Sequence, residues 1–79
     1  MSPELRSVRT RDIIRALERD GFILEHQTGS HATFREGRRK VIVAIHSLGA
    51  TIPIGTLHRI ITSARWSDDD LRRLRLVRD

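Results

Sequence analysis

Two segments of the chain place apolar residues at the spacing of an amphipathic helix. The first begins with Thr10, a good N-cap, and runs to about Asp20, after which Gly21 is suited to end a helix. The second begins near Pro53, because the fixed φ of proline suits the first turn of a helix. Their apolar stripes are Ile13, Ile14, Ala16 and Leu17 in the first segment and Leu57, Ile60, Ile61 and Ala64 in the second.

Between these two helices, apolar and polar residues alternate as they do in β-strands. Three strands are predicted, over residues 22–27, 31–35 and 40–46. The connecting turns, residues 28–30 and 36–39, each contain a glycine. Short turns of this kind join neighbouring antiparallel strands, so we expect an antiparallel meander of three strands.

Side-chain alternation assigns the two faces of this sheet. The inward positions are Ala32, Phe34, Val41, Val43 and Ile45, and the outward positions are His31, Thr33, Arg35, Ile42, Ala44 and His46. Both helices must cover the inward face to bury their apolar stripes, which predicts a two-layer α+β domain of order α-β-β-β-α. His31 and His46 are then expected to share the open face.

The end of the chain predicts a short third helix. Ser67 and Asp70 have the spacing of a capping box, and the helix is expected to continue through Leu71 and Leu74. Because 79 residues leave no room for a second domain, we assign residues 1–79 to one domain. We place its core at about residues 10–66, treat residues 67–79 as a C-terminal helical appendage, and expect residues 1–9 to be loosely ordered.

Composition narrows the class of protein. The chain has no cysteine, which excludes disulfides and thiolate metal sites. Its N-terminus lacks the basic segment followed by an apolar one that marks a signal peptide. No apolar run approaches the roughly 20 residues needed to span a membrane. We therefore expect a cytoplasmic protein with no membrane partner.

The charge of the chain favours a polyanionic partner. Lys and Arg number 15 against 10 Asp and Glu, for a net charge of +5, and only one of the 15 is a lysine. Because the planar guanidinium grips phosphate, this bias suits nucleic acid better than a membrane surface, although an acidic protein would use the same charge. A row of arginines on the first helix and four in the C-terminal tail are open to two interpretations, a binding surface or a solvated helix face. These residues are Arg11, Arg15, Arg19, Arg72, Arg73, Arg75 and Arg78.

The tripeptide Gly29-Ser30-His31 is the strongest candidate for chemistry. The glycine and serine form a tight turn that delivers an imidazole to the first position of the next strand. An imidazole accepts and donates protons near neutral pH, as acid–base catalysis requires. The alternative is a histidine that only caps the turn.

Several further segments, together with this tripeptide, resemble the HicA family of small toxins, the mRNA interferases of HicA–HicB toxin–antitoxin systems. The residues that support the resemblance are Gly21-Phe22, Gln27-Thr28-Gly29-Ser30-His31, the run 41–46, the run 52–57 and Ile60-Ile61. The resemblance extends over about residues 10–67. Family members often have basic residues where this chain has His26 and Thr28, and many have a polar or aromatic residue where it has Ala32.

The resemblance implies a fold similar to a double-stranded-RNA-binding domain, with the catalytic histidine of the family at His31. It also implies that the chain is an endoribonuclease that cleaves mRNA without a metal. A HicB-type antitoxin that covers the active site is the implied protein partner.

Around His31, the sequence offers groups that suit RNA cleavage. Ser30 and the backbone N–H groups of the Gly29 turn are expected to hold the phosphate, and His31 to remove the proton of the 2′-hydroxyl. Positive charge is expected from Arg35, Arg38, Arg39 and Lys40. His46 is a secondary candidate, either to orient substrate or protonate the leaving group, or only to hydrogen-bond the following loop. Trp66 is either a base-stacking residue or a core residue at a helix end.

No cofactor is predicted. Zinc usually takes at least three protein ligands, and only His31 and His46 are expected to face the same way, so we predict no metal site. Two functions remain open from the sequence. One is a metal-independent endoribonuclease toxin, and the other is a non-catalytic RNA-binding or antitoxin-binding module on the same fold.

Overall fold

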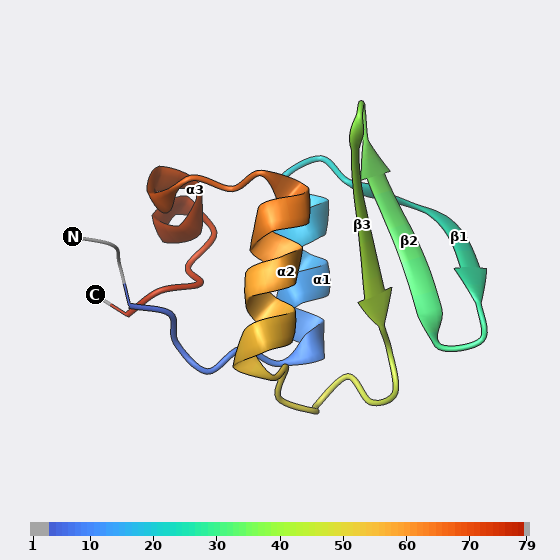
Figure 1. The fold of residues 1–79 in the computed structure, drawn as a ribbon, viewed down its shortest axis with the longest axis horizontal. Helices are drawn as coiled ribbons and strands as arrows, with labels where there is room; N and C mark the ends of the chain where they lie inside the picture. Colours follow the sequence, from blue (N-terminus) through green and yellow to red (C-terminus); the bar gives the residue numbers. More distant parts are fainter. Residues whose placement is uncertain (1–3, 79) are drawn as a thin grey trace.

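One layer of the structure is a three-stranded sheet and the other consists of two helices (Figure 1). The structure is a computed structural model that describes residues 4–78. The elements in chain order are α1 (Thr10–Arg19), β1 (Ile23–Thr28), β2 (His31–Glu36), β3 (Arg39–Ala44), α2 (Ile54–Ala64) and α3 (Asp68–Arg73). The predicted α-β-β-β-α order with a short C-terminal helix is confirmed.

The sheet is an antiparallel meander of order β1-β2-β3, as predicted. Each hairpin has a two-residue turn, since Thr28 pairs with His31 and Glu36 pairs with Arg39. Gly29 has a φ of 58° at the first position of its turn, and Gly37 has a φ of 56° at the equivalent position. Glycine adopts this backbone conformation without the steric cost that a side chain adds.

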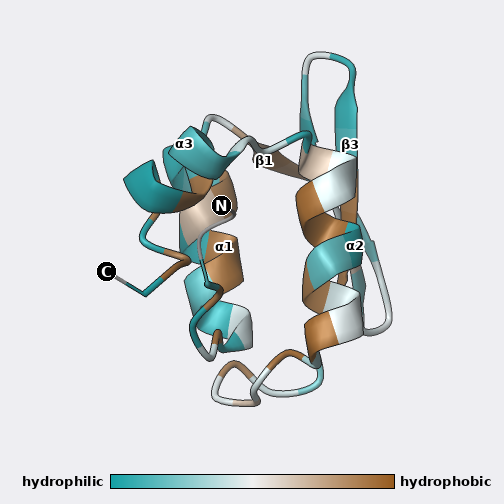
Figure 2. Cartoon of the chain, turned by 60° about the vertical axis from the view of Figure 1, so that its left-hand side comes forward, coloured by the Kyte–Doolittle hydropathy of each residue, from teal (hydrophilic) through white to brown (hydrophobic). Residues whose placement is uncertain are grey.

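The core lies between the inward face of the sheet and the two helices. Ala32, Phe34, Val41 and Val43 are buried, and their neighbours Ile42 and Ala44 are exposed, as alternation predicts. The buried helix residues are Ile13, Ala16 and Leu17 of α1 and Leu57, Ile60 and Ala64 of α2. Figure 2 shows the hydrophobic parts of α1 and α2 on the sides that turn toward each other.

The prediction for the third strand was two residues too long. β3 ends at Ala44, and Ile45 is only half-buried against the core. The Ile45 N–H still donates to the carbonyl oxygen of Ser30 at 2.6 Å. One backbone hydrogen bond thus extends the pairing of β2 and β3 past Ala44. The alternation of apolar and polar residues in the sequence continues beyond the end of the strand.

Both ends of the described chain pack against the domain. Leu5 forms an isolated antiparallel bridge with Val77, and Val8 is 1% exposed. The expectation that residues 1–9 are loosely ordered was wrong for residues 5–9, while residues 1–3 lie outside the described part. Apolar residues distant in sequence give this segment its partners, which no local pattern reveals. The core therefore extends beyond residues 10–66 to include Leu71, Leu74, Leu76 and Val77.

The carboxylate of Asp20 joins four elements at one end of the helical layer. Arg39 at the start of β3 donates to Asp20 Oδ2 at 2.8 Å, and so does Nε1 of Trp66, which follows α2, also at 2.8 Å. Arg73 of α3 donates to Oδ1 at 2.7 Å. The Arg39 guanidinium also lies 4.5 Å from the centre of the Phe22 ring. Burial raises the pKa of Asp20, but the hydrogen bonds from Trp66, Arg73 and Arg39 outweigh it and hold that pKa below its usual value.

The capping box predicted for the third helix is present. The Asp70 N–H donates to the Ser67 hydroxyl at 3.2 Å, and the Ser67 N–H donates to Asp70 Oδ2 at 2.9 Å. The hydrogen bond from the Ser67 N–H lowers the pKa of Asp70, and Arg73 lowers it further. Among residues 4–78, no helix combines the length and the apolar composition that crossing a membrane requires.

We expect Asp20→Asn to lower the free energy of unfolding by about 2–3 kcal/mol, because a hydrogen bond to a charged group contributes about 1.5–3 kcal/mol. Urea denaturation measures this change. The matched control is Asp69→Asn, since the Asp69 side chain is 97% exposed and its ion pair with Arg72 is a surface pair that contributes little. Equal losses in the two variants would contradict a central role for Asp20.

We also expect the protein to lose stability in acid. The pKa of Asp20 is lower in the folded state than the usual unfolded value of about 3.9. Its stabilisation is therefore complete above that value and is lost as the pH falls through the folded pKa. Urea denaturation at a series of pH values from 7 downward should show the loss below about pH 5, and Asp20→Asn should show a smaller loss over the same range. A parallel decline in both proteins would assign the acid sensitivity to other carboxyl groups.

Candidate active site

His31 occupies the first position of β2, directly after the Gly29-Ser30 turn, as the sequence predicts. Its side chain is exposed on the face of the sheet opposite the core residue Ala32. It pairs with Thr28 of β1 on one side and with Ala44, the last residue of β3, on the other. The turn before it is fixed from the other side by the hydrogen bond from Ile45 to Ser30. The backbone therefore holds the imidazole at a defined place at the end of the hairpin.

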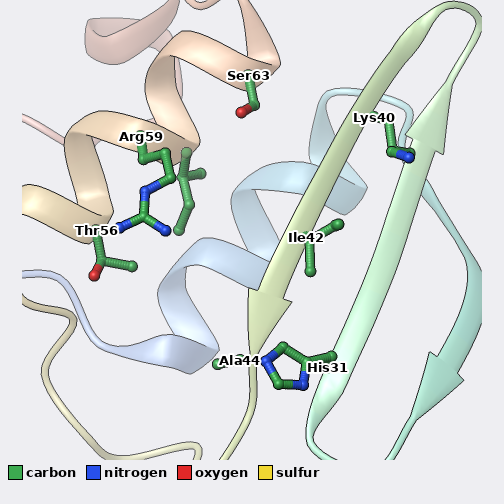
Figure 3. Close-up of a pocket in the computed structure, with 8 residues that line it drawn as sticks. His31, Lys40, Ile42, Ala44, Thr56, Arg59 and Ser63 are labelled. Atoms are coloured by element: carbon green, nitrogen blue, oxygen red, sulfur yellow. The ribbon is translucent and has the colours of Figure 1, made fainter.

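A cavity of about 480 Å³ lies beside His31, between the outward positions of β3 and one side of α2. This volume falls within the roughly 300–1,000 Å³ of typical ligand pockets. The lining residues are His31, Lys40, Ile42, Ala44, Thr56, Arg59, Ile60 and Ser63. Figure 3 shows His31 and Ala44 at one end of this cavity and Lys40 and Ser63 at the other.

The polar lining of the cavity is basic. Lys40 and Arg59 are both exposed, and neither forms an ion pair with a carboxylate within residues 4–78. No Asp or Glu is among the residues that line the cavity. Two hydroxyl groups, from Thr56 and Ser63, add neutral donors. This set of side chains suits an anionic ligand.

The helix wall of the cavity follows from the periodicity of α2. Thr56, Arg59, Ile60 and Ser63 stand at positions i, i+3, i+4 and i+7, which place them on one side of a helix. Ile60 is buried in the core, whereas the other three are at least partly exposed. The cavity therefore runs along the border between the buried and exposed sides of α2.

This wall was not predicted from the sequence. The pattern of the second helix predicted only the apolar stripe Leu57, Ile60, Ile61 and Ala64, and neither Arg59 nor Ser63 was identified as a site residue. The available signal was their spacing around Ile60, but an arginine beside a core stripe is usually solvated. Only the packing of α2 along β3 shows what these side chains face.

The other predicted phosphate-binding residues do not all lie at this cavity. Lys40 lines it, while Arg38 is exposed in the turn between β2 and β3. Arg35 forms an ion pair with Glu25 of β1 at 2.6 Å. Arg39 is turned the other way, with its side chain only 22% exposed and its guanidinium bonded to Asp20 and Glu36. The structure therefore gives Arg39 a place in the core network instead of at the cavity.

His46 lies beyond β3 and lines a second cavity of about 270 Å³. The two cavities share Ala44, Thr56 and Ile60, so they adjoin each other along the border of β3 and α2. His31 and His46 thus occupy neighbouring cavities of one groove. Within residues 4–78, the side chain of His46 forms no hydrogen bond, so the alternative in which it only bonds the following loop is not observed.

Two remaining expectations concern metals and Trp66. Within residues 4–78, no three His, Asp or Glu side chains gather in a way that could hold a metal ion. Trp66 is 6% exposed, and its Nε1 is bonded to Asp20. It is therefore a core residue at a helix end, and the base-stacking alternative was wrong.

The fold and the site together define a small α-β-β-β-α domain with an exposed histidine beside a basic cavity. A family model described as the HicA toxin of bacterial toxin–antitoxin systems matches residues 10–66. The chain therefore belongs to the HicA toxin family, and the resemblance stated from the sequence is confirmed. This family implies an antitoxin partner. A comparison with curated proteins gives no match.

We expect Gly29→Ala and Gly37→Ala each to lower the free energy of unfolding by about 1–2 kcal/mol, because both glycines have a positive φ. An added Cβ meets no atom within 4 Å at either position, so the cost is backbone strain alone. Urea denaturation of the two variants measures it. A loss much larger than this at Gly29 alone would show a contact that the open surroundings of the residue do not account for.

Proposed function

We propose that this protein is the toxin of a HicA–HicB system and acts as a metal-independent endoribonuclease on mRNA, with His31 as the general base. The observation that supports this proposal is the exposed imidazole of His31 at one end of a cavity lined by two cations that pair with no carboxylate of residues 4–78. RNA supplies the remaining chemistry, because its 2′-hydroxyl is an internal nucleophile.

In the proposed reaction, His31 takes the proton of the 2′-hydroxyl, and the 2′-oxygen attacks the adjacent phosphorus. The bond from phosphorus to the 5′-oxygen breaks, and that oxygen takes a proton from water. The products are a 2′,3′-cyclic phosphate and a 5′-hydroxyl end. His31 then releases its proton to solvent, which restores the base.

The groups around His31 have separate tasks in this mechanism. Ser30 and the backbone of the Gly29 turn hold the phosphate at the cleaved bond. Lys40 balances the negative charge of the adjacent part of the RNA backbone. Arg35 and Arg38 contribute to the field along the β2–β3 hairpin without lining the cavity. His46, in the adjoining cavity, orients the part of the RNA that lies beyond the cleaved bond.

The proposal includes neutralisation by a HicB-type antitoxin that covers the His31 cavity. The net charge of +5 gives an acidic antitoxin surface a fast, steered encounter with the toxin. The C-terminal arginines contribute unequally, because Arg72 and Arg73 are paired with carboxylates of α3 and Asp20.

We expect His31→Ala to reduce RNA cleavage by roughly 100- to 10,000-fold, the usual contribution of general acid–base catalysis. The measurement uses purified protein with a defined RNA in the presence of a chelator. An RNA with one 2′-deoxy substitution at the cleaved nucleotide should stay intact, because the nucleophile is missing.

Gly37→Ala is the matched control for this experiment, because it strains the hairpin turn remote from His31 and leaves the catalytic group in place. It should cleave RNA at nearly the parent rate when folded. If the parent protein binds RNA but leaves it intact, the non-catalytic binding module replaces the endoribonuclease.

A further inference from the structure

The wall of the cavity that α2 provides has no role in the mechanism above. Of its exposed residues, Arg59 is the only one that carries a full charge, and it stands across the cavity from the β3 residues Ile42 and Ala44. In Figure 3 its side chain extends along α2 toward Thr56, in the direction of the end at which His31 and Ala44 lie. Arg59 is therefore directed to the same part of the cavity as the imidazole.

The environment of Arg59 leaves its guanidinium free for a ligand. It has no hydrogen-bond or ion-pair partner within residues 4–78, whereas Arg6, Arg35, Arg39, Arg72 and Arg73 are each paired with a carboxylate. The side chain is exposed, so it contributes nothing to the core. A planar fork with five donors and no partner matches the geometry of a phosphate group.

The floor of the cavity has a different chemistry. Ile42 lies in the central part of β3, and its side chain is 52% exposed. The cations that line the same cavity are Lys40 of β3 and Arg59 of α2. Together with Ala44 and the edge of Ile60, it forms an apolar surface between Lys40 and the His31 end. An apolar floor flanked by cations fits one nucleotide, with its base on the floor and its phosphates at the two ends.

The dimensions of the cavity agree with a single strand of RNA. The outward positions Lys40, Ile42 and Ala44 cover four residue steps of β3, or roughly 13 Å at about 3.3 Å per step. The stripe from Thr56 to Ser63 covers seven steps of α2, or roughly 10 Å at 1.5 Å per step. The two walls thus run alongside each other for the length of one to a few nucleotides.

From these observations we propose that α2 is the second wall of the RNA site and that Arg59 binds the phosphate attacked by the 2′-oxygen. Lys40 binds the next phosphate, and the intervening base lies on Ile42 and Ala44. Arg59 then stabilises the negative charge that develops on the phosphate oxygens while His31 removes the proton. This inference rests on the proposed function, because it identifies a second substrate-binding group at the same site.

The test separates binding from cleavage. The probe is a short, fluorescently labelled single-stranded RNA with 2′-O-methyl groups, which offers no 2′-hydroxyl and is not cleaved by the proposed mechanism. Fluorescence anisotropy at several salt concentrations gives the affinity and its salt dependence for the parent protein, Arg59→Ala, Arg59→Lys and Arg19→Ala. Arg19 is the control because it is an exposed arginine of α1 that lines neither cavity of the groove.

Arg59→Ala should weaken RNA binding roughly 10- to 100-fold, as expected for the loss of hydrogen bonds to a charged group. It should also reduce the slope of log K against log salt by about 0.7, the value for one phosphate contact on a single strand. Arg59→Lys should recover the slope but only part of the affinity, because lysine keeps the charge and loses the fork. Arg19→Ala should leave the slope unchanged.

Thermal unfolding verifies that each variant is folded, and Arg59→Gln serves as a second neutral variant that keeps more of the side-chain length. If Arg59→Ala and Arg59→Gln bind the RNA with the affinity and slope of Arg19→Ala, the proposal is overturned, and an acidic protein surface becomes the better ligand for this wall. Because the probe is not cleaved, this result is independent of catalysis. A parent protein that binds the probe through Arg59 but cleaves no RNA would refute the endoribonuclease and retain the binding wall.

Discussion

The carboxylate of Asp20 is the contact on which the arrangement of the helical layer depends. Asp20 directly follows α1, and its carboxylate accepts hydrogen bonds from Arg39 at the start of β3, from Trp66 just beyond α2 and from Arg73 of α3. With a side chain only 12% exposed, this carboxylate needs cationic partners to offset its loss of hydration. Arg39 and Arg73 supply the charge and Trp66 a neutral donor. One acidic side chain therefore sets where four elements meet, in a domain too small to rely on a large core.

This arrangement also determines how the arginines of the chain are divided. Arg39 also bonds Glu36 and the carbonyl oxygen of Ala64, and its exposed neighbour Lys40 points to the opposite face of β3. The alternation of a strand thus sends one cation into the structure and the next into the cavity beside His31. Within residues 4–78, six acidic side chains pair with arginines that lie outside the cavity, and no carboxylate lines the cavity itself. In this way part of the excess positive charge of the sequence, that of Lys40, is located at the cavity beside His31.

Local patterns were sufficient to predict most of the fold. The strands, the turn glycines and the apolar stripes follow from periods of two and 3.6 residues, which depend only on neighbouring residues. Contacts between distant residues were not accessible in the same way. Val8 and Leu76 have no local pattern that joins them, and Ile45 continues the alternation of β3 although the strand has ended.

The candidate site shows the same division. Gly29-Ser30-His31 and Lys40 could be placed from the sequence, because each follows from a turn or from strand alternation. The place of Arg39 could not, because its partners Asp20 and Ala64 lie 19 and 25 residues away. Arg59 was missed for a related reason, since its surroundings depend on how α2 packs against β3. A charged residue on a helix has the same local signature whether it faces solvent or a cavity.

The bridge between Leu5 and Val77 has a consequence for how this protein is made. Arg6 and Arg78 add backbone hydrogen bonds on either side of it, from the Arg6 N–H to Leu76 and from the Arg78 N–H to Glu4. A ribosome adds Val77 72 residues after Leu5 (77 − 5), so Leu5 has no bridge partner until translation has passed Val77. The hairpins, whose contacts are local, have theirs much sooner. Closure of this bridge therefore waits for Val77, and a nascent chain interrupted before Leu76 lacks part of the core.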